Sequence, residues 1–313
     1  MKKLSTLILL AFFSFGCSNS MENSMNPFFT DYDAPYQIPP FDEVKEDHYM
    51  PAFEKGMKEQ LEEIDQIANN PEQPTFENTL VELERTGKTL SKVADVFFNL
   101  LSSNTNELMD KIAAEVSPKL SAHSDAISLN KKLFDRVHAV YEQRNELGLS
   151  TEQMRLVEET HKGFIRSGVQ LDTPSMEKLT QINQELSSLS VQFDQNLLKE
   201  TNEGYSLLID DENQLDGLPE DFRDQAAKLA EENGQDGKWM FKPTRVSMYP
   251  FLTYSTQRDL REKLYTSYIK RGDNDNDRDN KNLAIEMADL RLERANLLGY
   301  KTCLLYTSDA ADE

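Results

Sequence analysis

Histidine and acidic side chains are the residues of this chain whose types could support metal binding or acid–base chemistry. The four histidines are His48, His123, His138 and His161. None belongs to a His-Glu-x-x-His pattern, which would place two zinc ligands and a general base on one helical face. Glu158 and His161 have the i, i+3 spacing of di-iron bundle proteins, but that site needs a second such pair and two further glutamates. We therefore expect Glu158 and His161 to lie on a solvated helix face.

Serine and cysteine give no catalytic pattern either. The chain has no Gly-x-Ser-x-Gly elbow that would expose a nucleophilic serine. Its two cysteines, Cys17 and Cys303, stand near opposite ends, and we expect neither a disulfide nor thiol chemistry from them. These two residue types therefore give no sign of nucleophilic catalysis.

The acidic run at positions 273–280 leaves two alternatives open. Four acidic residues fall at positions 1, 3, 5 and 12 of a helix-flanked calcium loop: Asp275, Asp277, Asp279 and Glu286. Asn280 stands at position 6, where the loop needs glycine, and Asn282 stands at position 8, where an apolar residue is usual. The other alternative is an acidic turn whose Asp and Asn side chains cap a helix over residues 283–298.

The N-terminal residues have the pattern of an export signal. Two lysines, Lys2 and Lys3, precede an apolar run over residues 4–15 that is shorter than the roughly 20 residues of a membrane span. The run ends at Gly16 and Cys17, as in the cleavage site of a bacterial lipoprotein. We therefore interpret Cys17 as the lipid attachment site of an exported, periplasmic protein anchored to a membrane. The alternative is a buried N-terminal helix with an incidental cysteine.

The C-terminal residues 303–313 resemble the translation of a sequencing-library adapter. We therefore interpret this tail as an artefact, which implies that the chain is the front of a longer protein. A tail of this origin was never selected to fit the core, so we expect it to pack against nothing specific.

The composition excludes several classes of protein. The chain has 313 residues, with 34 Lys and Arg against 55 Asp and Glu, and a formal net charge of −21. Because binding to phosphates needs a surplus of basic residues, this balance excludes a nucleic-acid partner. The 16 Phe and 11 Tyr supply enough apolar surface to exclude a disordered chain.

The spacing of the apolar residues predicts that most of the chain is helical. Between positions 41 and 203 the apolar residues recur at helical spacing, as in Met176, Leu179, Ile182, Leu186, Leu189, Phe193 and Leu197. Ser150 with Gln153 has the pattern of a capping box, and Thr173 with Pro174 has that of a cap followed by proline at the first helical position. Long helices joined by short turns need one another's apolar faces, so the sequence predicts a mainly α multi-helix array.

The pattern changes near residues 204–243. Residues 205–209 and 238–241 have the composition of two short strands, around a helix that starts near Pro219. They predict a small strand-containing α/β insertion, after which helix returns from Ser255.

These signals predict five regions. A signal peptide at 1–16 precedes a tether and docked extended segment at 17–40 and an N-terminal helical domain at 41–203. The insertion and the start of the following helical region occupy 204–302, and the adapter-like tail occupies 303–313.

Several segments together resemble one peptidase family over residues 26–302. They are Pro40-Phe41-Asp42 before Pro51-Ala52-Phe53, Pro74-Thr-Phe-Glu-Asn-Thr79, His123-Ser-Asp-Ala-Ile127, Arg258-x-x-Arg261-Glu-Lys-Leu-Tyr265 and Arg294-Ala-Asn-Leu-Leu-Gly-Tyr300. This combination resembles the N-terminal half of bacterial peptidyl-dipeptidases (dipeptidyl carboxypeptidases), in the thimet oligopeptidase and oligopeptidase A family of zinc metallopeptidases. Asn26-Pro-Phe-Phe29 and Leu147-Gly-Leu149 favour the dipeptidase branch over the endopeptidase branch.

The resemblance implies a fold and an activity. It implies one half of an almost all-helical clam, whose two halves flank a channel that admits only short unstructured peptides. In the intact enzyme, zinc and its bound water would hydrolyse peptides and release C-terminal dipeptides. The family's zinc ligands and catalytic residues lie in its C-terminal half, so none is carried over to this chain. This fragment is therefore expected to bind no zinc and to be inactive, and to meet a membrane only through its lipid anchor.

Two alternatives to this interpretation stay open. The chain could instead be a helical lipoprotein complete in itself, acting as a peptide-binding or scaffold module. Within the enzyme class, the activity could instead be that of an endo-oligopeptidase.

Overall fold

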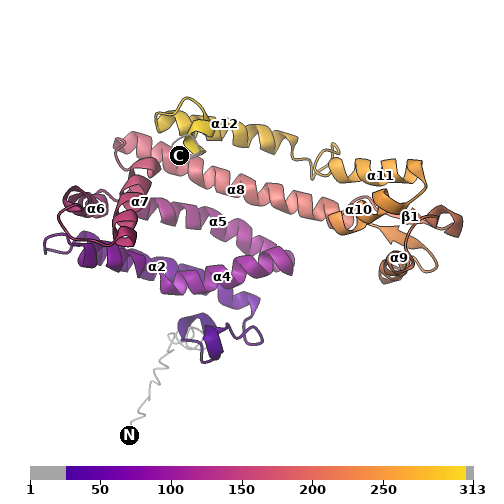
Figure 1. The fold of residues 1–313 in the computed structure, drawn as a ribbon, viewed down its shortest axis with the longest axis horizontal. Helices are drawn as coiled ribbons and strands as arrows, with labels where there is room; N and C mark the ends of the chain where they lie inside the picture. The colour runs from indigo at the N-terminus through magenta and orange to yellow at the C-terminus, as the bar shows by residue number, and fades with distance from the viewer. Residues whose placement is uncertain (1–25, 308–313) are drawn as a thin grey trace, which may run out of the picture. The chain divides into compact units, whose positions relative to one another are not determined.

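The computed structural model describes residues 26–307, and 70% of it is helical (Figure 1). This confirms the prediction of a mainly α fold. Contacts group the chain into two compact units that divide between Ile112 and Ala113, within helix α5 (Glu107–Ser128). The signal peptide, Cys17 and residues 308–313 lie outside the described residues.

The first unit contains two long helices and several short helical segments. They are α2 (Tyr49–Ala68), the π-helical η4 (Phe76–Val81), α3 (Glu82–Glu84), α4 (Lys88–Ser103) and the first residues of α5, with 3₁₀ turns at Pro27–Phe29, Pro35–Gln37 and Glu46–His48.

Helices α2 and α4 pack closely in the first unit. Gly56 permits the approach, because a Cβ atom there would lie 2.7 Å from the backbone nitrogen of Leu90. The rings of Phe53 and Phe97 meet edge to face with centroids 5.4 Å apart, and both are fully buried. Edge-to-face pairs of buried rings stabilise a packed core beyond the apolar area that they remove from water.

The Asn26-Pro-Phe-Phe29 segment docks at the start of α2. The Asn26 amide donates to the carbonyl oxygen of His48 at 2.8 Å, and its Oδ1 accepts from the backbone N–H of Phe28. The buried Phe28 ring lies 5.6 Å from that of Tyr49. The segment is therefore held by both a buried amide and an aromatic contact.

The second unit contains the remaining elements. They are the rest of α5, α6 (Lys131–Gln143), α7 (Thr151–Ser167), α8 (Thr173–Glu203), β1 (Leu207–Ile209), η5 (Glu212–Leu215), α9 (Glu220–Glu232), β2 (Trp239–Phe241), α10 (Arg245–Tyr254), α11 (Arg258–Ile269), α12 (Lys281–Leu297) and α13 (Cys303–Thr307).

Helices α8 and α12 lie side by side in this unit (Figure 1). Ile182, Leu186 and Leu189 of α8 form a buried cluster with Met287 of α12. These α8 positions belong to the apolar stripe that the sequence pattern predicted.

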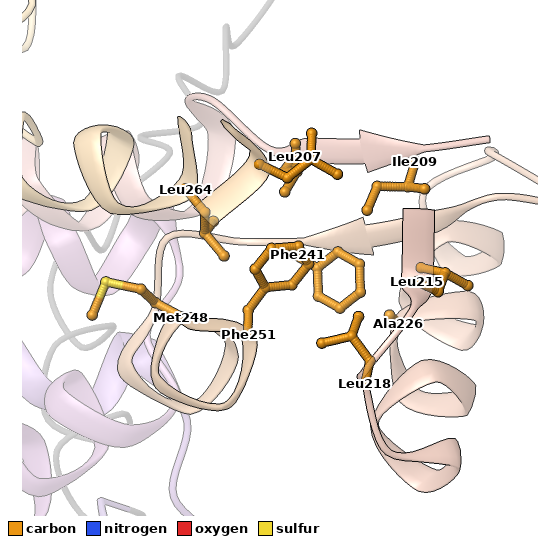
Figure 2. Close-up of a cluster of buried hydrophobic side chains, with 10 residues drawn as sticks. Leu207, Ile209, Leu215, Leu218, Ala226, Phe241, Met248, Phe251 and Leu264 are labelled. Atoms are coloured by element: carbon orange, nitrogen blue, oxygen red, sulfur yellow. The ribbon is translucent and has the colours of Figure 1, made fainter. Parts of the chain in front are cut away.

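The two predicted strands pair and cover a second cluster. β1 and β2 are antiparallel, with Leu207 opposite Phe241 and Ile209 opposite Trp239, which confirms the predicted strand-containing insertion. Figure 2 shows Leu207 and Ile209 directed at the cluster that contains Phe241 and Phe251. The rings of Phe241 and Phe251 lie 4.8 Å apart, so this cluster joins the strands to α10.

Helix starts were predicted with one error. Ser150 and Gln153 form the expected capping box, with bonds of 3.3 and 2.9 Å. The cap of α8 is Asp172 and not Thr173: its carboxylate accepts from the backbone N–H of Ser175 at 2.9 Å. Thr173 is already helical, because the carboxylate one residue earlier reaches the free N–H group.

The first residues of the tail make contacts. The ring of Tyr306, in α13, has its centroid 5.4 Å from that of Tyr300. The Arg294 guanidinium lies 5.2 Å from the centroid of the Tyr306 ring. The carbonyl oxygen of Tyr306 accepts from Arg166. The expectation that the tail packs against nothing is wrong for these residues, because the Tyr306 ring meets the Tyr300 ring edge to face and lies beside the Arg294 guanidinium.

Candidate functional site

A cavity of about 870 Å³ opens beside α11 in the second unit. Its walls come from the end of α8, a residue two positions before β1, a residue two positions after β2, α11 and the loop that follows α11. The lining residues are Glu200, Tyr205, Pro243, Asp259, Glu262, Lys263, Thr266, Ser267, Lys270, Arg271, Asn274 and Asn276. This volume falls within the range of about 300–1,000 Å³ that is usual for small-molecule sites.

Helix α11 turns a polar face to this cavity. Asp259, Lys263, Thr266 and Lys270 recur at spacings of three or four residues, which places them on one side of the helix. The opposite side buries Leu260 and Leu264 in the cluster under β1 and β2. The amphipathic pattern of α11 thus fixes which charges reach the cavity.

Glu200 supplies a buried charge at one end of the cavity. Its side chain is only 6% exposed. Oε2 accepts from the backbone N–H of Gly272 and Oε1 from the amide of Asn276, both at a long 3.4 Å. No ion pair joins Glu200 to any cation in residues 26–307. Burying a carboxylate that makes only long hydrogen bonds lowers the stability of the fold. The position therefore favours binding of a further cation or hydrogen-bond donor.

Arg271 lines the same cavity, and its guanidinium is held in place by its neighbours. Its guanidinium donates to Thr201 Oγ1 at 3.0 Å and to the carbonyl oxygen of Tyr268 at 2.9 Å. It also lies 4.1 Å from the centroid of the Tyr268 ring. Lys263 and Lys270 are exposed, so their ammonium groups remain accessible. These three cations balance Glu200, Asp259 and Glu262, although the whole chain carries −21.

The loop after α11 is tied to α8 by a buried asparagine. Gly272 has φ +74°, a conformation that favours glycine, and its carbonyl oxygen accepts from the backbone N–H of Asn280 at 2.8 Å. The Asn280 amide donates to the carbonyl oxygen of Phe193 at 3.0 Å and accepts from Asn196 at 2.9 Å. These bonds hold the cavity rim in one position.

The acidic run is a turn centred on a lysine. The ammonium of Lys281 lies 2.6, 2.9 and 2.8 Å from carboxylate oxygens of Asp273, Asp275 and Asp279. The bond from Lys281 lowers the pKa of the Asp279 carboxyl to about 2. Lys281 thus pairs with Asp275 and Asp279, two of the four carboxylates that a calcium loop would use, which favours the acidic-turn alternative. Asp279 also accepts from the first backbone N–H of α12, at 2.9 Å.

His161 does not lie on a solvated face, so that prediction is wrong. Its ring is 8% exposed, stacks on Tyr141 with centroids 3.8 Å apart, and places Nε2 3.0 Å from Nδ1 of His138. Burial lowers the pKa of His161, and the neighbouring His138 lowers it further. The partners come from α6, and the sequence of α7 alone carried no sign of them. Glu158, by contrast, is half exposed and pairs with Arg144 at 3.5 Å.

The remaining histidines have structural surroundings. Nδ1 of His48 accepts from the backbone N–H of Lys45 at 3.1 Å. His123 is buried within α5, and this burial lowers the pKa of its ring. Residues 26–307 contain no group of three or more His, Cys, Asp or Glu side chains that could hold a metal ion. No helix in that range is long and apolar enough to cross a membrane.

The cavity itself was not predicted from the sequence. The sequence does predict that one side of α11 is polar, because the helical period places on it Asp259, Lys263, Thr266 and Lys270. Glu200 gives no such signal, because a glutamate in the last turn of a long amphipathic helix is usually a solvated residue. In the structure, the loop with Gly272 and Asn276 returns to the end of α8 and binds the Glu200 carboxylate.

Comparison with known proteins identifies relatives of the chain, although no family model matches it. It is 36% identical over 277 residues to a dipeptidyl carboxypeptidase of Escherichia coli, covering 88% of this chain and 40% of the relative. It is 30% identical over 269 residues to an oligopeptidase A of Haemophilus influenzae, covering 85% of this chain and 39% of the relative. The chain is therefore a homologue, over about two fifths of their length, of the dipeptidyl carboxypeptidases and oligopeptidases A.

Proposed function

We propose that this chain is part of a zinc-dependent peptidyl-dipeptidase that releases C-terminal dipeptides from short peptides. The observation that carries the proposal is the 36% identity to a dipeptidyl carboxypeptidase over 88% of the chain. The identities to oligopeptidases A are lower, at 30% and 26%, which favours a dipeptidase over an endo-oligopeptidase.

Zinc does not fit the residues that the structure describes. Histidine and carboxylate side chains between residues 26 and 307 form no group that could hold a metal ion. In this proposal the zinc ligands and the catalytic residues belong to a part of the protein outside this chain. The chain alone is accordingly proposed to be inactive.

The contribution of this chain is to bind and orient peptides. Within the second unit, the rim of the cavity beside α11 is fixed by Asn280 and Gly272. Rigid positioning of a substrate supplies part of the rate enhancement of an enzyme, because less orientational freedom is lost during reaction.

We also propose that the protein is exported to the periplasm and anchored by a lipid on Cys17. The support is the sequence pattern of Lys2, Lys3, the apolar run and Gly16 before the cysteine. Cys17→Ala should release the protein from the membrane fraction and abolish lipid labelling, whereas the neighbouring Ser18→Ala should change neither. Membrane association that survives Cys17→Ala without any lipid would contradict the anchor.

Peptide cleavage tests the enzymatic proposal. The gene should be read beyond Thr302 and its full product purified beside this chain. The full product should release dipeptides from an N-acetylated tetrapeptide with a free carboxyl end, and the present chain should not. Cleavage of C-terminally amidated peptides at internal bonds would indicate an endo-oligopeptidase instead. Peptide binding without cleavage by the full product would indicate a peptide-binding lipoprotein.

A further inference from the structure

We propose that the cavity beside α11 binds short peptides with two free ends, with Glu200 holding the α-ammonium group and Lys270 the α-carboxylate. The choice of peptides as ligands rests on the proposed function. The free dipeptide released by such an enzyme is the smallest ligand of this class, so the cavity would retain the product.

The cavity holds a buried carboxylate that lacks a cationic partner among the described residues. Glu200 is almost fully buried and has no ion pair with a described residue, so a ligand ammonium would compensate a charge that the fold leaves with two 3.4 Å hydrogen bonds. Charge-assisted hydrogen bonds to a carboxylate are roughly twice as strong as neutral ones.

The cavity also holds cations that could bind a carboxylate. Lys263 and Lys270 stand on the same face of α11, and neither forms an ion pair with residues 26–307. Arg271 is held by Thr201 and Tyr268, so it adds fixed positive potential near Glu200 without being free to move. A ligand with one charge would leave one set of these groups without a partner, whereas a zwitterion satisfies both.

The length of the cavity suits a short peptide. The cavity-lining face of α11 runs from Asp259 to Lys270, roughly 16 Å at 1.5 Å per residue. An extended peptide advances about 3.3–3.6 Å per residue, so about five residues fit along it. A dipeptide occupies only part of this length, and the half-exposed Tyr205 and buried Pro243 offer apolar contact to its side chains.

Calorimetric titration of the folded chain with the dipeptide Ala-Ala tests the inference. We expect saturable binding, weakened at least tenfold by Glu200→Gln and by Lys270→Met. Glu220→Gln and Lys301→Met remove the same charges elsewhere and should leave the affinity unchanged. Glutamine keeps a carbonyl acceptor for Gly272, and circular dichroism should show that each variant is folded. Lys270 is exposed, so Lys270→Met tests the site even if Glu200→Gln fails to fold.

Blocked dipeptides separate the two ends. N-acetyl-Ala-Ala should bind weakly and with equal affinity to the wild type and Glu200→Gln, and the amide of Ala-Ala should be insensitive to Lys270→Met. Absence of saturable Ala-Ala binding, or affinity unchanged by both substitutions, overturns the inference. If the full gene product still releases dipeptides in that case, the proposed function stands without this site.

Discussion

Nδ1 of His138 and Nε2 of His161 lie 3.0 Å apart, across the contact between α6 and α7. At this distance the N–H of one ring donates a hydrogen bond to the unprotonated nitrogen of the other. The geometry is therefore compatible with two neutral rings. Protonation of both rings would place two positive charges in contact. The Tyr141 ring covers His161, while Arg144 lies 3.8 Å from the Tyr141 centroid and adds further positive charge.

This pair predicts loss of stability in acid. Burial, His138 and Arg144 lower the pKa of His161 below 6.5, and Glu142 only partly opposes them. The unfolded chain therefore binds a proton at higher pH than the folded chain does. The contribution of His161 is fully present above about pH 6.5 and decreases as the pH falls toward its lower folded value. Urea unfolding between pH 7.5 and 5 should show this decrease.

His161→Phe provides the matched variant. Phenylalanine keeps the stack on Tyr141 and removes the titrating ring, so the free energy of unfolding should depend less on pH between 7.5 and 5. Identical pH dependence in the variant and the wild type would show that the pair does not titrate with unfolding.

The cluster under the two strands predicts a large mutational effect. Phe251 is fully buried against Phe241, so Phe251→Ala should lower the free energy of unfolding by about 3–5 kcal/mol. Val246, on the same helix, is 82% exposed, and Val246→Ala should change it by less than about 0.5 kcal/mol. Urea unfolding measures both. Equal losses would mean that Phe251 is not part of the core.

The helical fold was predictable because periodicity is a local signal. The apolar stripe of α8 and the two short strands each follow from the spacing of neighbouring residues. The capping box at Ser150 follows from a pattern of four residues. The cap of α8 was misplaced by one residue, since Asp172 and Thr173 both suit that position and only geometry decides between them.

The cavity and the histidine pair were not predictable, because each depends on residues that are distant in sequence. Glu200 is buried by a loop that returns 72 residues later, at Gly272. His161 meets His138 across two helices. Neither contact leaves a periodic trace in one sequence. The resemblance to a peptidase family predicted a function, whereas the individual residues predicted none.

Lys281 predicts a measurable change in a neighbouring pKa. It holds three carboxylates, and its bond lowers the pKa of Asp279 to about 2. In Lys281→Met that bond is absent, so the pKa of Asp279 should rise toward 3.8. Because the wild-type carboxylate is charged down to lower pH when folded, the associated stability is present above about pH 4 and lost toward pH 2. The variant should lack this acid-dependent component.

NMR titration of the side-chain carboxyl carbons measures this change directly. Lys301→Met removes the same charge elsewhere and should leave the Asp279 titration where it is. An unchanged Asp279 pKa in Lys281→Met would contradict the assignment of the turn to this lysine. Added calcium provides a second reading: the variant, with three free carboxylates, should bind it more tightly than the wild type does.

Asn280 predicts a coupling between the loop and the cavity. Its amide donates to the Phe193 carbonyl and accepts from Asn196, so Asn280→Ala leaves two polar groups of α8 without these partners. Loss of a partner for a buried polar group costs about 1–3 kcal/mol, which urea unfolding would resolve. The exposed Asn282→Ala should cost less than about 0.5 kcal/mol. The backbone N–H of Asn280 keeps its bond to Gly272 in the variant, but the loss of both amide bonds to α8 should loosen the rim and weaken Ala-Ala binding. A destabilised variant with unchanged dipeptide affinity would show that the rim acts independently of α8.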